Sequence, residues 1–299
     1  MARRVPPPRA KAVLAAGADA GPGRADFPSA GAALVSAAEP RLRSESGMRR
    51  RDALTGAGLV AAWGGAVAAG LGWSGPLAAQ PILGPPEPFS WEGLIEQART
   101  LATQPYRHPG DERPPQIAAL TWDQHNAIRY RRDKSLWVGT DLPFQVQFFH
   151  LGMFYDKAVK IFEVVDGQAR PLAYDPALFD FGPTRLDPPP PPDLGFAGWR
   201  AHFHTNFEQD VAVFLGASYF RATDRGDHYG MSCRGLGVGT GLPEPEEFPL
   251  FSRFWLVRQR PTDIALTVYA LLESESVTGA YRFGIAPGGV TTMDVTAHL

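Results

Sequence analysis

Residues 160–172, KIFEVVDGQARPL, place Asp166 and Gly167 between two apolar runs. An Asp-Gly pair in this position is the strongest short signal for a β-hairpin, because both residues tolerate the left-handed backbone of a two-residue turn. The stretch therefore predicts two neighbouring antiparallel strands.

A two-residue period, typical of strands, recurs on both sides of this hairpin. Residues 144–148 alternate phenylalanine or valine with glutamine, and residues 199–207, WRAHFHTNF, alternate over their whole length. The prolines at 188–192 indicate an extended surface connection. The fold class that follows is all-β, a large antiparallel β-sandwich. Further strand-like runs lie at 251–258, 264–274, 279–285 and 291–299.

Two short helical signals precede the strands. Ser90 can cap a helix in which Leu94, Ala98 and Leu101 share a face. Thr121 stands three residues before a glutamine, which is the spacing of a capping box. We therefore expect a short helical N-terminal preface to the sandwich.

Composition excludes several classes of function. The chain has 299 residues, 44% hydrophobic and 20% charged, with a net charge of −2, which gives no reason to expect a nucleic-acid partner. Cys233 is the single cysteine, so an intramolecular disulfide is impossible and a cysteine-based metal site is disfavoured. We interpret Cys233 as a packed thiol in preference to a nucleophile.

The N-terminal region reads as unstructured sequence followed by an export signal. Residues 1–47 show no helical or strand period and are interpreted as disordered or as upstream codons included by mistake. Residues 48–79 show the order of a signal peptide: arginines, a weakly apolar run and small residues before Gln80. Arg50 and Arg51 resemble a twin-arginine signal, which predicts the twin-arginine export machinery as a partner and a periplasmic location.

The alternative to a signal peptide is a membrane anchor at residues 53–71, which are long enough to span a bilayer. The run is mostly alanine and glycine, so its insertion would be only weakly favoured. We therefore expect no stable membrane anchor, and a mature chain that starts near Gln80.

Residues with possible catalytic or metal chemistry each have a simpler interpretation. His202 and His204 could share one strand face and bind a metal, but no third ligand is specified, so a solvated polar face is favoured and no metal site is predicted. Glu246 and Glu247 could serve as glycosidase carboxylates, but paired acids of that kind are distant in sequence and cannot be found by spacing. Both pairs therefore stay unassigned.

The stretch 211–237 mixes aromatic, arginine and glycine residues. Flat apolar faces and planar donors are what a sugar-binding groove needs, and the segment from Tyr219 through Arg221 and Tyr229 to Arg234 contains both. Core aromatics with surface arginines would give the same pattern, and the residues alone favour that simpler interpretation.

Four long segments resemble the periplasmic glucan biosynthesis proteins G and D. They are LWVGTDLPFQVQFFHLGMFYDKAVKIFEV (136–164), FLGASYFRA (214–222), YGMSCRGLGVGTGLPEPEEFPLFSRFW (229–255) and LTVYALLESESVTGAYRFGI (266–285). The resemblance extends from about Phe89 to Leu299. The arginine pair at 50–51 looks like the D branch, whereas the G branch typically uses the general secretory route.

The resemblance implies a large sandwich with a long cleft and a smaller immunoglobulin-like domain after it. It also implies binding of a β-1,2-linked glucan, with inverting hydrolysis of that glucan in the D branch and no cofactor. Family members continue past the point that matches Leu299, and their catalytic carboxylates lie in that further part. We therefore expect residues 80–299 to be the N-terminal part of the sandwich, with no catalytic residue assigned. The alternative is that the last strand-like run, 291–299, is the paired edge strand of a finished sandwich.

Candidate substrate-binding residues follow from the motifs of the resemblance. These candidates, offered as structural or cleft-lining positions, are Tyr219, Arg221, Tyr229, Arg234 and Glu247. The family usually has GLSARGLA where this chain has GMSCRGLG, so Cys233 stands at an ordinary small-residue position.

Three functions stay open. They are a glucan-binding protein that trims glucan when complete, a non-catalytic glucan-binding module, and a structural periplasmic module without a sugar site.

Overall fold

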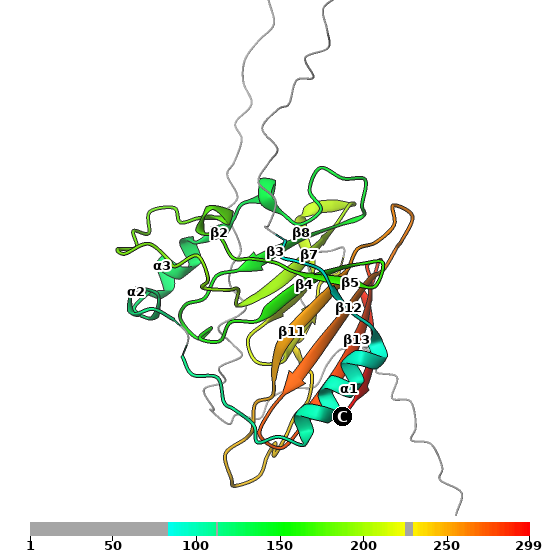
Figure 1. Ribbon diagram of the computed structural model, residues 1–299. Helices are drawn as coiled ribbons and strands as arrows, with labels where there is room; N and C mark the ends of the chain where they lie inside the picture. Colours follow the sequence, from blue (N-terminus) through cyan, green and yellow to red (C-terminus); the bar gives the residue numbers. More distant parts are fainter. Residues whose placement is uncertain (1–82, 112, 225–229) are drawn as a thin grey trace, which may run out of the picture. The chain divides into compact units, whose positions relative to one another are not determined.

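The computed structural model describes residues 83–111, 113–224 and 230–299 (Figure 1). The expectations for residues 1–47 and 48–79, including Arg50 and Arg51, lie outside the described residues, as does Tyr229. The helices are α1 (Trp91–Ala102), α2 (Pro115–Ala118) and α3 (Trp122–Ala127). The strands are β1 (Glu87–Pro88), β2 (Arg129–Tyr130), β3 (Phe144–Phe149), β4 (Lys160–Val165), β5 (Gln168–Pro171), β6 (Phe179–Asp180), β7 (Gly198–Phe203), β8 (Asn206–Leu215), β9 (Tyr219–Ala222), β10 (Cys233–Arg234), β11 (Leu250–Val257), β12 (Leu266–Glu273), β13 (Thr278–Ala286) and β14 (Thr292–His298).

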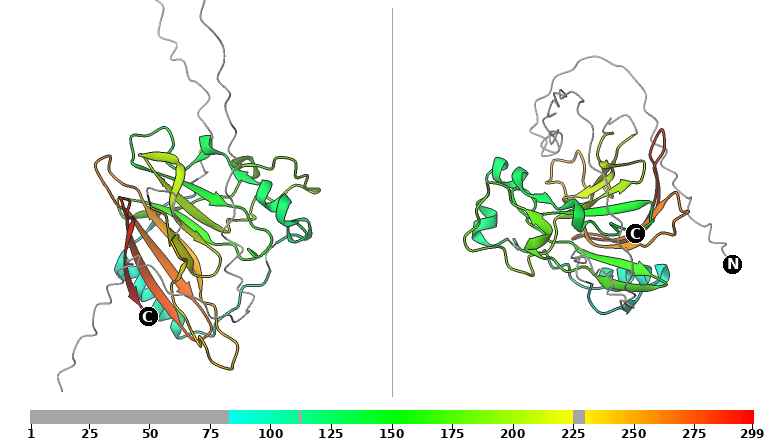
Figure 2. Two further views of the ribbon diagram at one scale, coloured as in Figure 1. Left: turned by 180° about the vertical axis from the view of Figure 1, so that it is seen from behind. Right: turned by 90° about the horizontal axis from the view of Figure 1, so that it is seen from above.

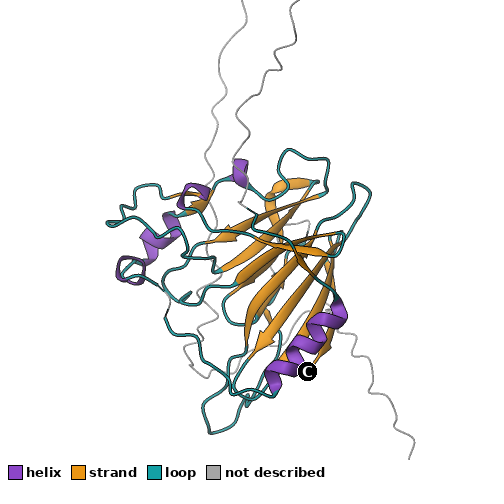
Figure 3. Ribbon diagram, viewed as in Figure 1, coloured by secondary structure: helices purple, strands orange, loops and turns teal. Residues whose placement is uncertain are grey.

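Two large sheets form the described fold, which confirms the all-β sandwich (Figures 1 and 3). One sheet has seven strands in the order β1-β5-β4-β11-β12-β13-β14, and the other has five in the order β10-β9-β8-β7-β3. A separate pair, β2 and β6, lies beside α3 (Figure 1). Figure 2 shows the same layers from behind and from above.

The predicted hairpin is present as β4 and β5. Val165 pairs with Gln168, and the two turn residues between them, Asp166 and Gly167, have φ values of 49° and 72°. A two-residue turn with positive φ at both positions matches the right-handed twist of the strands. Local chemistry therefore determines this hairpin.

One strand pair departs from the antiparallel expectation. β4 and β11 are parallel neighbours, with Phe254 beside Ile161. After β5 the chain crosses to the five-stranded sheet and then returns to the seven-stranded sheet as β11. A parallel pair needs a long connection of this kind, and no local sequence signal marks it.

Aromatic side chains fill the space between the two sheets. The Trp199 ring stacks on Phe214 at 4.5 Å between centroids, and Phe214 meets Phe254 and Phe283 edge-on at 5.5 and 5.0 Å. Trp199 and Phe214 come from the five-stranded sheet, whereas Phe254 and Phe283 come from the seven-stranded sheet. Offset and edge-to-face aromatic contacts of this kind stabilise the interface beyond simple area burial.

The helical preface is confirmed and covers the other face of the seven-stranded sheet (Figure 3). Ser90 Oγ accepts from the backbone N–H of Gly93 at 3.0 Å, and Leu94 and Ala98 are buried against the sheet. At α3, Thr121 and its glutamine partner form the predicted capping box. In the described residues, no helix has both the length and the apolar character needed to cross a membrane.

Residues 199–207 do not form one strand, which corrects the sequence expectation. β7 ends at Phe203 and β8 begins at Asn206, so Thr205 and Phe207 do not continue the face of Trp199. His202 is 3% exposed and His204 is exposed in the turn, so the expected solvated face is wrong for His202. Alternation cannot distinguish one long strand from two strands joined by a tight turn.

Candidate functional site

The turn between β8 and β9 places Tyr219 at the rim of the sandwich. Phe220 points into the core against Phe214 and Phe283, so its neighbour Tyr219 points to the other side of the strand. Gly216 in the turn has φ of 75°, and a Cβ there would lie 3.3 Å from the Tyr155 ring. The turn therefore needs glycine both for its backbone and for its close approach to Tyr155.

Arg234 lies beside two aromatic rings. Its guanidinium carbon is 5.8 Å from the centroid of Tyr219, its partner across β9 and β10, and 5.4 Å from that of Phe248. Arg234 Nη1 is 2.6 Å from Glu246 Oε1, and Thr240 Oγ1 donates to the same oxygen at 2.8 Å. We call Tyr219, Arg234, Thr240, Glu246 and Phe248 the Arg234 cluster.

Charge and hydrogen bonding hold the Arg234 cluster in its ionised form. The pKa of Glu246 is lowered, first by the Thr240 hydroxyl and then by the Arg234 guanidinium. Phe248 is 54% exposed, so one ring of the cluster faces solvent. The result is a planar cation beside exposed aromatic surface, which is suited to hydroxyl-rich ligands.

Glu247 points away from this cluster. Its Oε1 accepts from the Ser274 hydroxyl and from the backbone N–H of Ser276, the latter at 3.0 Å. Burial opposes ionisation of Glu247, but these hydrogen bonds outweigh it and lower the pKa. The charge of Glu247 also acts on Tyr106, whose pKa is raised first by burial and then by three carboxylates, those of Glu273, Glu247 and Glu275.

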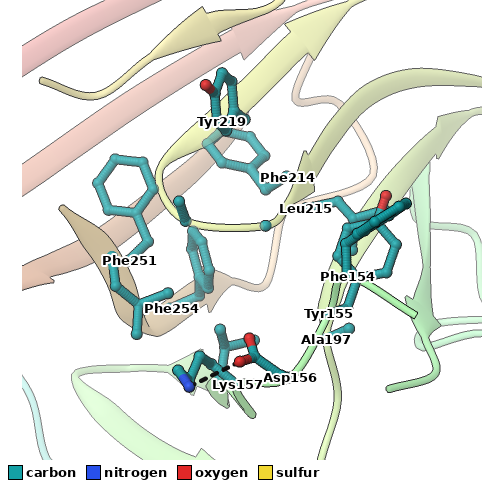
Figure 4. A pocket seen from close by; sticks show the side chains of 14 residues that line it. Phe154, Tyr155, Asp156, Lys157, Ala197, Phe214, Leu215, Tyr219, Phe251 and Phe254 are labelled. Atoms are coloured by element: carbon teal, nitrogen blue, oxygen red, sulfur yellow. Dashed lines mark hydrogen bonds and ion pairs between the residues drawn. The ribbon is translucent and has the colours of Figure 1, made fainter. Parts of the chain in front are cut away.

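Three hollows that share lining residues extend from Tyr219 to Ser274 and Ser276, the partners of Glu247. The first has a volume of about 30 Å³ and is lined by Tyr219, Phe154 and Leu250 among others (Figure 4). The second hollow has a volume of about 180 Å³ and shares Leu250 with the first. The third has a volume of about 230 Å³ and shares Tyr106 and Glu273 with the second. We call this series the rim groove.

The volumes decide where a sugar could lie. About 30 Å³ is the share of one water molecule in the liquid, so the first hollow cannot enclose a pyranose ring. A sugar there would rest on the rim, against Tyr219 and against Phe154, which is 68% exposed. The two wider hollows offer more depth, with Arg107, Lys160 and Glu273 among their polar lining groups.

The walls of the rim groove are tied together across the chain. Arg113 donates to the backbone oxygen of Met153, and Lys157 Nζ donates to that of Gly110 at 3.0 Å. Lys157 also pairs with Asp156 at 2.8 Å, as Figure 4 shows. These contacts join the segment after α1 to the loop that carries Phe154.

The structure brings together only part of the predicted site. Tyr219 and Arg234 are in contact, whereas Arg221 lies near Tyr155, where its charge opposes the rise in the pKa of that tyrosine caused by burial. Glu247 binds Ser274 and Ser276, which line the hollow of the rim groove that lies away from Tyr219. Cys233 is half-buried and burial raises the pKa of its thiol, in agreement with a packed thiol.

Sequence reasoning missed Phe248, Thr240 and Tyr106 as members of the site. Phe248 directly follows two glutamates in the motif EPEEFP, so the sequence shows that it lies near charged groups. The sequence does not show that its partner is Arg234. His202 is buried: its Nδ1 lies 3.0 Å from the Gln209 backbone oxygen, and burial lowers its pKa to about 3. Among the residues that the structure describes, no group of three or more potential ligand side chains could hold a metal ion.

Residues 89–299 match the family model described as "Periplasmic glucan biosynthesis protein, MdoG". The chain belongs to this family. Relatives of the periplasmic glucan biosynthesis family include glucans biosynthesis protein D 1 of Ralstonia nicotianae, 49% identical over 84% of this chain and 47% of the relative. Glucans biosynthesis protein G of Rhodopseudomonas palustris is 48% identical over 72% of this chain and 43% of the relative. Glucans biosynthesis protein D of Xylella fastidiosa is 46% identical over 84% of this chain and 48% of the relative.

The coverage and the identities of these matches both bear on function. The chain spans about half the length of the curated relatives it matches. Relatives named D and relatives named G match at nearly equal identity, so assignment to the D branch stays a prediction from Arg50 and Arg51. The Arg234 cluster and the described rim groove lie within the matched residues.

Proposed function

We propose that this chain is a periplasmic protein of osmoregulated periplasmic glucan biosynthesis that binds a β-1,2-linked glucan along the rim groove. The observation that carries the proposal is the Arg234 guanidinium beside the rings of Tyr219 and Phe248, together with the place of Tyr219 in the lining of the first hollow of that groove. Planar donors beside aromatic faces recognise the hydroxyls and the apolar face of a pyranose. Family membership supports glucan as the sugar.

Export belongs to the same proposal. The arginine pair at 50–51 and the apolar run after it support transport by the twin-arginine machinery and cleavage before Gln80. The family description supports a periplasmic destination. Cleavage predicts that the protein recovered from periplasm begins near Gln80.

We propose glucan trimming only for a longer protein that contains this region together with the part of the relatives that this chain does not match. An inverting glycosidase needs a general acid whose pKa is raised. Glu246 and Glu247 both have lowered pKa values, because Thr240 and Arg234 stabilise the charge of the first, and Ser274 and Ser276 that of the second. Neither carboxyl suits the role of the acid.

The test is binding and chain shortening of linear β-1,2-glucan by the full 299-residue chain, measured by calorimetry and mass spectrometry. We expect saturable binding of intact glucan, and about tenfold weaker binding for Tyr219→Ala with little change in melting temperature. Tyr219→Phe keeps the ring and should bind nearly as well. Trp122→Ala removes a 40% exposed aromatic outside the rim groove and should change nothing.

The other outcomes separate the alternatives. Shortened glucan would place the catalytic acids within this chain and overturn the assignment of trimming to a longer protein. Saturable binding of glucan that is not shortened would fit both the proposal and a non-catalytic binding module. Absence of binding at millimolar glucan would favour a structural module and contradict the proposal.

A further inference from the structure

The second hollow of the rim groove gathers positive charge. Lys160 on β4, Arg253 on β11 and Arg107 in the segment after α1 all contribute to its lining. The lining contains one carboxylate, that of Glu273. Three cationic side chains therefore share this hollow with a single acid.

Lys160 and Arg253 are direct neighbours across the parallel strand pair of β4 and β11 (Figure 1). Paired residues of a sheet point to the same face, and so does the residue two positions further along each strand. Those further residues, Phe162 and Trp255, belong to the apolar cluster against which α1 packs. Both cationic side chains therefore lie on this outer face of the seven-stranded sheet.

The three cations of the second hollow have no ion pair within the described part of the chain. Lys160 and Arg107 are exposed, and Arg253 is half-buried. The Glu273 carboxylate instead accepts a hydrogen bond from the Ser252 hydroxyl. Lys160 and Arg253 therefore repel each other, with no described carboxylate within ion-pair distance of either.

The third hollow has the opposite balance of charge. Glu273 and Glu275 line it together with one cation, Arg107. Glu247 adds a further carboxylate nearby, because burial and then the charges of these three acids raise the pKa of Tyr106, which lines both hollows. An anion in the rim groove would therefore be attracted to the second hollow and repelled from the third.

The side chains of the second hollow suit an anionic oxygen group. An arginine presents a planar fork of N–H donors that matches phosphate or carboxylate oxygens, and a lysine adds a compact charge. The volume of about 180 Å³ is several times the share of one water molecule, about 30 Å³, so a small oxyanion has room there. A neutral hydroxyl would leave the repulsion between Lys160 and Arg253 in place.

We propose that the second hollow binds an anionic group of the phosphate type that is carried on a sugar chain, with Lys160, Arg253 and Arg107 as its cationic partners. The place of the sugar chain in the rim groove rests on the proposed function, whereas the attraction of an anion rests on the charges of this hollow. The ligand that fits the groove best is then a glucan with an anionic substituent.

The test compares two probes on the full chain by calorimetry at low salt. One is linear β-1,2-glucan, and the other is the same glucan partly phosphorylated on its primary hydroxyls. We expect the phosphorylated glucan to bind about tenfold more tightly than the neutral one. Added sodium chloride should reduce this ratio of affinities, because salt screens exposed charges. Inorganic phosphate alone, titrated in the same way, should bind more weakly than the phosphorylated glucan.

Variants of the cations assign the ratio to this hollow. Lys160→Gln combined with Arg253→Gln should bring the ratio close to one. Lys160→Glu should do the same and raise the melting temperature, because it replaces a repulsive neighbour of Arg253 with an attractive one. Arg282→Gln is the matched control, since this exposed arginine lies on the same sheet outside the three hollows, and it should leave the ratio unchanged.

Failure of this inference differs from failure of the proposed function. Equal affinities of the two glucans for the unmodified chain, both weakened by Tyr219→Ala, would overturn the anion site and leave the proposed function standing. Binding of the phosphorylated glucan alone, lost in the double variant, would support the anion site and contradict binding of unmodified glucan. A ratio that survives in Lys160→Glu would refute the assignment to this hollow even where the double variant fails to fold. Inorganic phosphate that binds as tightly as the phosphorylated glucan would refute the claim that a sugar carries the anion.

Discussion

Arg234 shows how a single side chain can be oriented before any ligand binds. Its charge is matched by Glu246, and its guanidinium carbon lies 5.8 and 5.4 Å from the ring centroids of Tyr219 and Phe248. The ion pair and the two ring contacts together restrict the orientation of the guanidinium. An ammonium group can also contact aromatic rings, but it lacks the planar fork of N–H donors.

Arg234→Lys therefore tests shape against charge at the site. We expect linear β-1,2-glucan to bind about tenfold more weakly, nearly as weakly as with Arg234→Ala, because charge alone does not reproduce the planar donor. The melting temperature should change little, because the ion pair is partly exposed. Arg99→Lys on α1, where the side chain is 71% exposed, is the control. Full binding by Arg234→Lys would show that only the positive charge matters.

Among the elements, β7 and β8 leave no room for a side chain at Gly198. A Cβ added there would lie 2.2 Å from the Phe214 backbone oxygen and 3.1 Å from the Leu215 Cα. Backbone atoms in a strand pair cannot rotate away as a side chain can. The five-stranded sheet, and with it the turn that positions Tyr219, depends on glycine at this point.

Gly198→Ala should lower the free energy of unfolding by about 1–3 kcal/mol, because the strands must separate to admit the methyl group. In a folded region of this size that corresponds to roughly 2–4 °C of melting temperature for each kcal/mol. Gly284→Ala in β13 is the matched control, since its Cβ would meet only the Asp294 side chain, at 3.8 Å. We expect that control to be neutral or stabilising by about 0.4–1 kcal/mol. Equal melting temperatures for the two variants would contradict the close approach.

At the scale of the whole molecule, two buried histidines make stability depend on pH. Burial lowers the pKa of His150 to about 4 and that of His202 to about 3. His150 Nε2 lies 2.8 Å from the Tyr174 hydroxyl, and the charges of Arg200 and Arg132 oppose protonation of His202. Both side chains are therefore neutral in the folded protein at neutral pH.

The sign of the pH dependence follows from these lowered values. Below about pH 6.5 the unfolded chain binds protons that the folded chain does not. The free energy of unfolding therefore falls as the pH is lowered, until the pH reaches the pKa values of the folded state, about 4 for His150 and about 3 for His202. Each histidine should contribute a slope of roughly 1 kcal/mol per pH unit. Urea unfolding between pH 7 and pH 4 measures the slope. His202→Asn, which keeps a donor for the Gln209 oxygen and cannot titrate, should make it shallower, and an unchanged slope would refute this assignment.

Local chemistry made several elements predictable from the sequence. The Asp166-Gly167 turn, the Ser90 cap and the capping box at Thr121 depend on residues within a few positions of each other, and all three are present in the structure. The long alternating runs likewise predicted the strands from β11 to β14. For the site, the sequence indicated Tyr219 and Arg234 as residues of a sugar-binding type but not that they touch.

By itself, then, the sequence determined the strand-rich sandwich, its helical preface and its family, because each of these is written in local patterns or long motifs. Only the tertiary structure decided the parallel pairing of β4 with β11, the burial of His202 and the opposite directions of Glu246 and Glu247. The physical reason is that these features depend on which distant segment packs beside each residue. That choice is made by the burial of the aromatic core between the two sheets, over separations that no local pattern records.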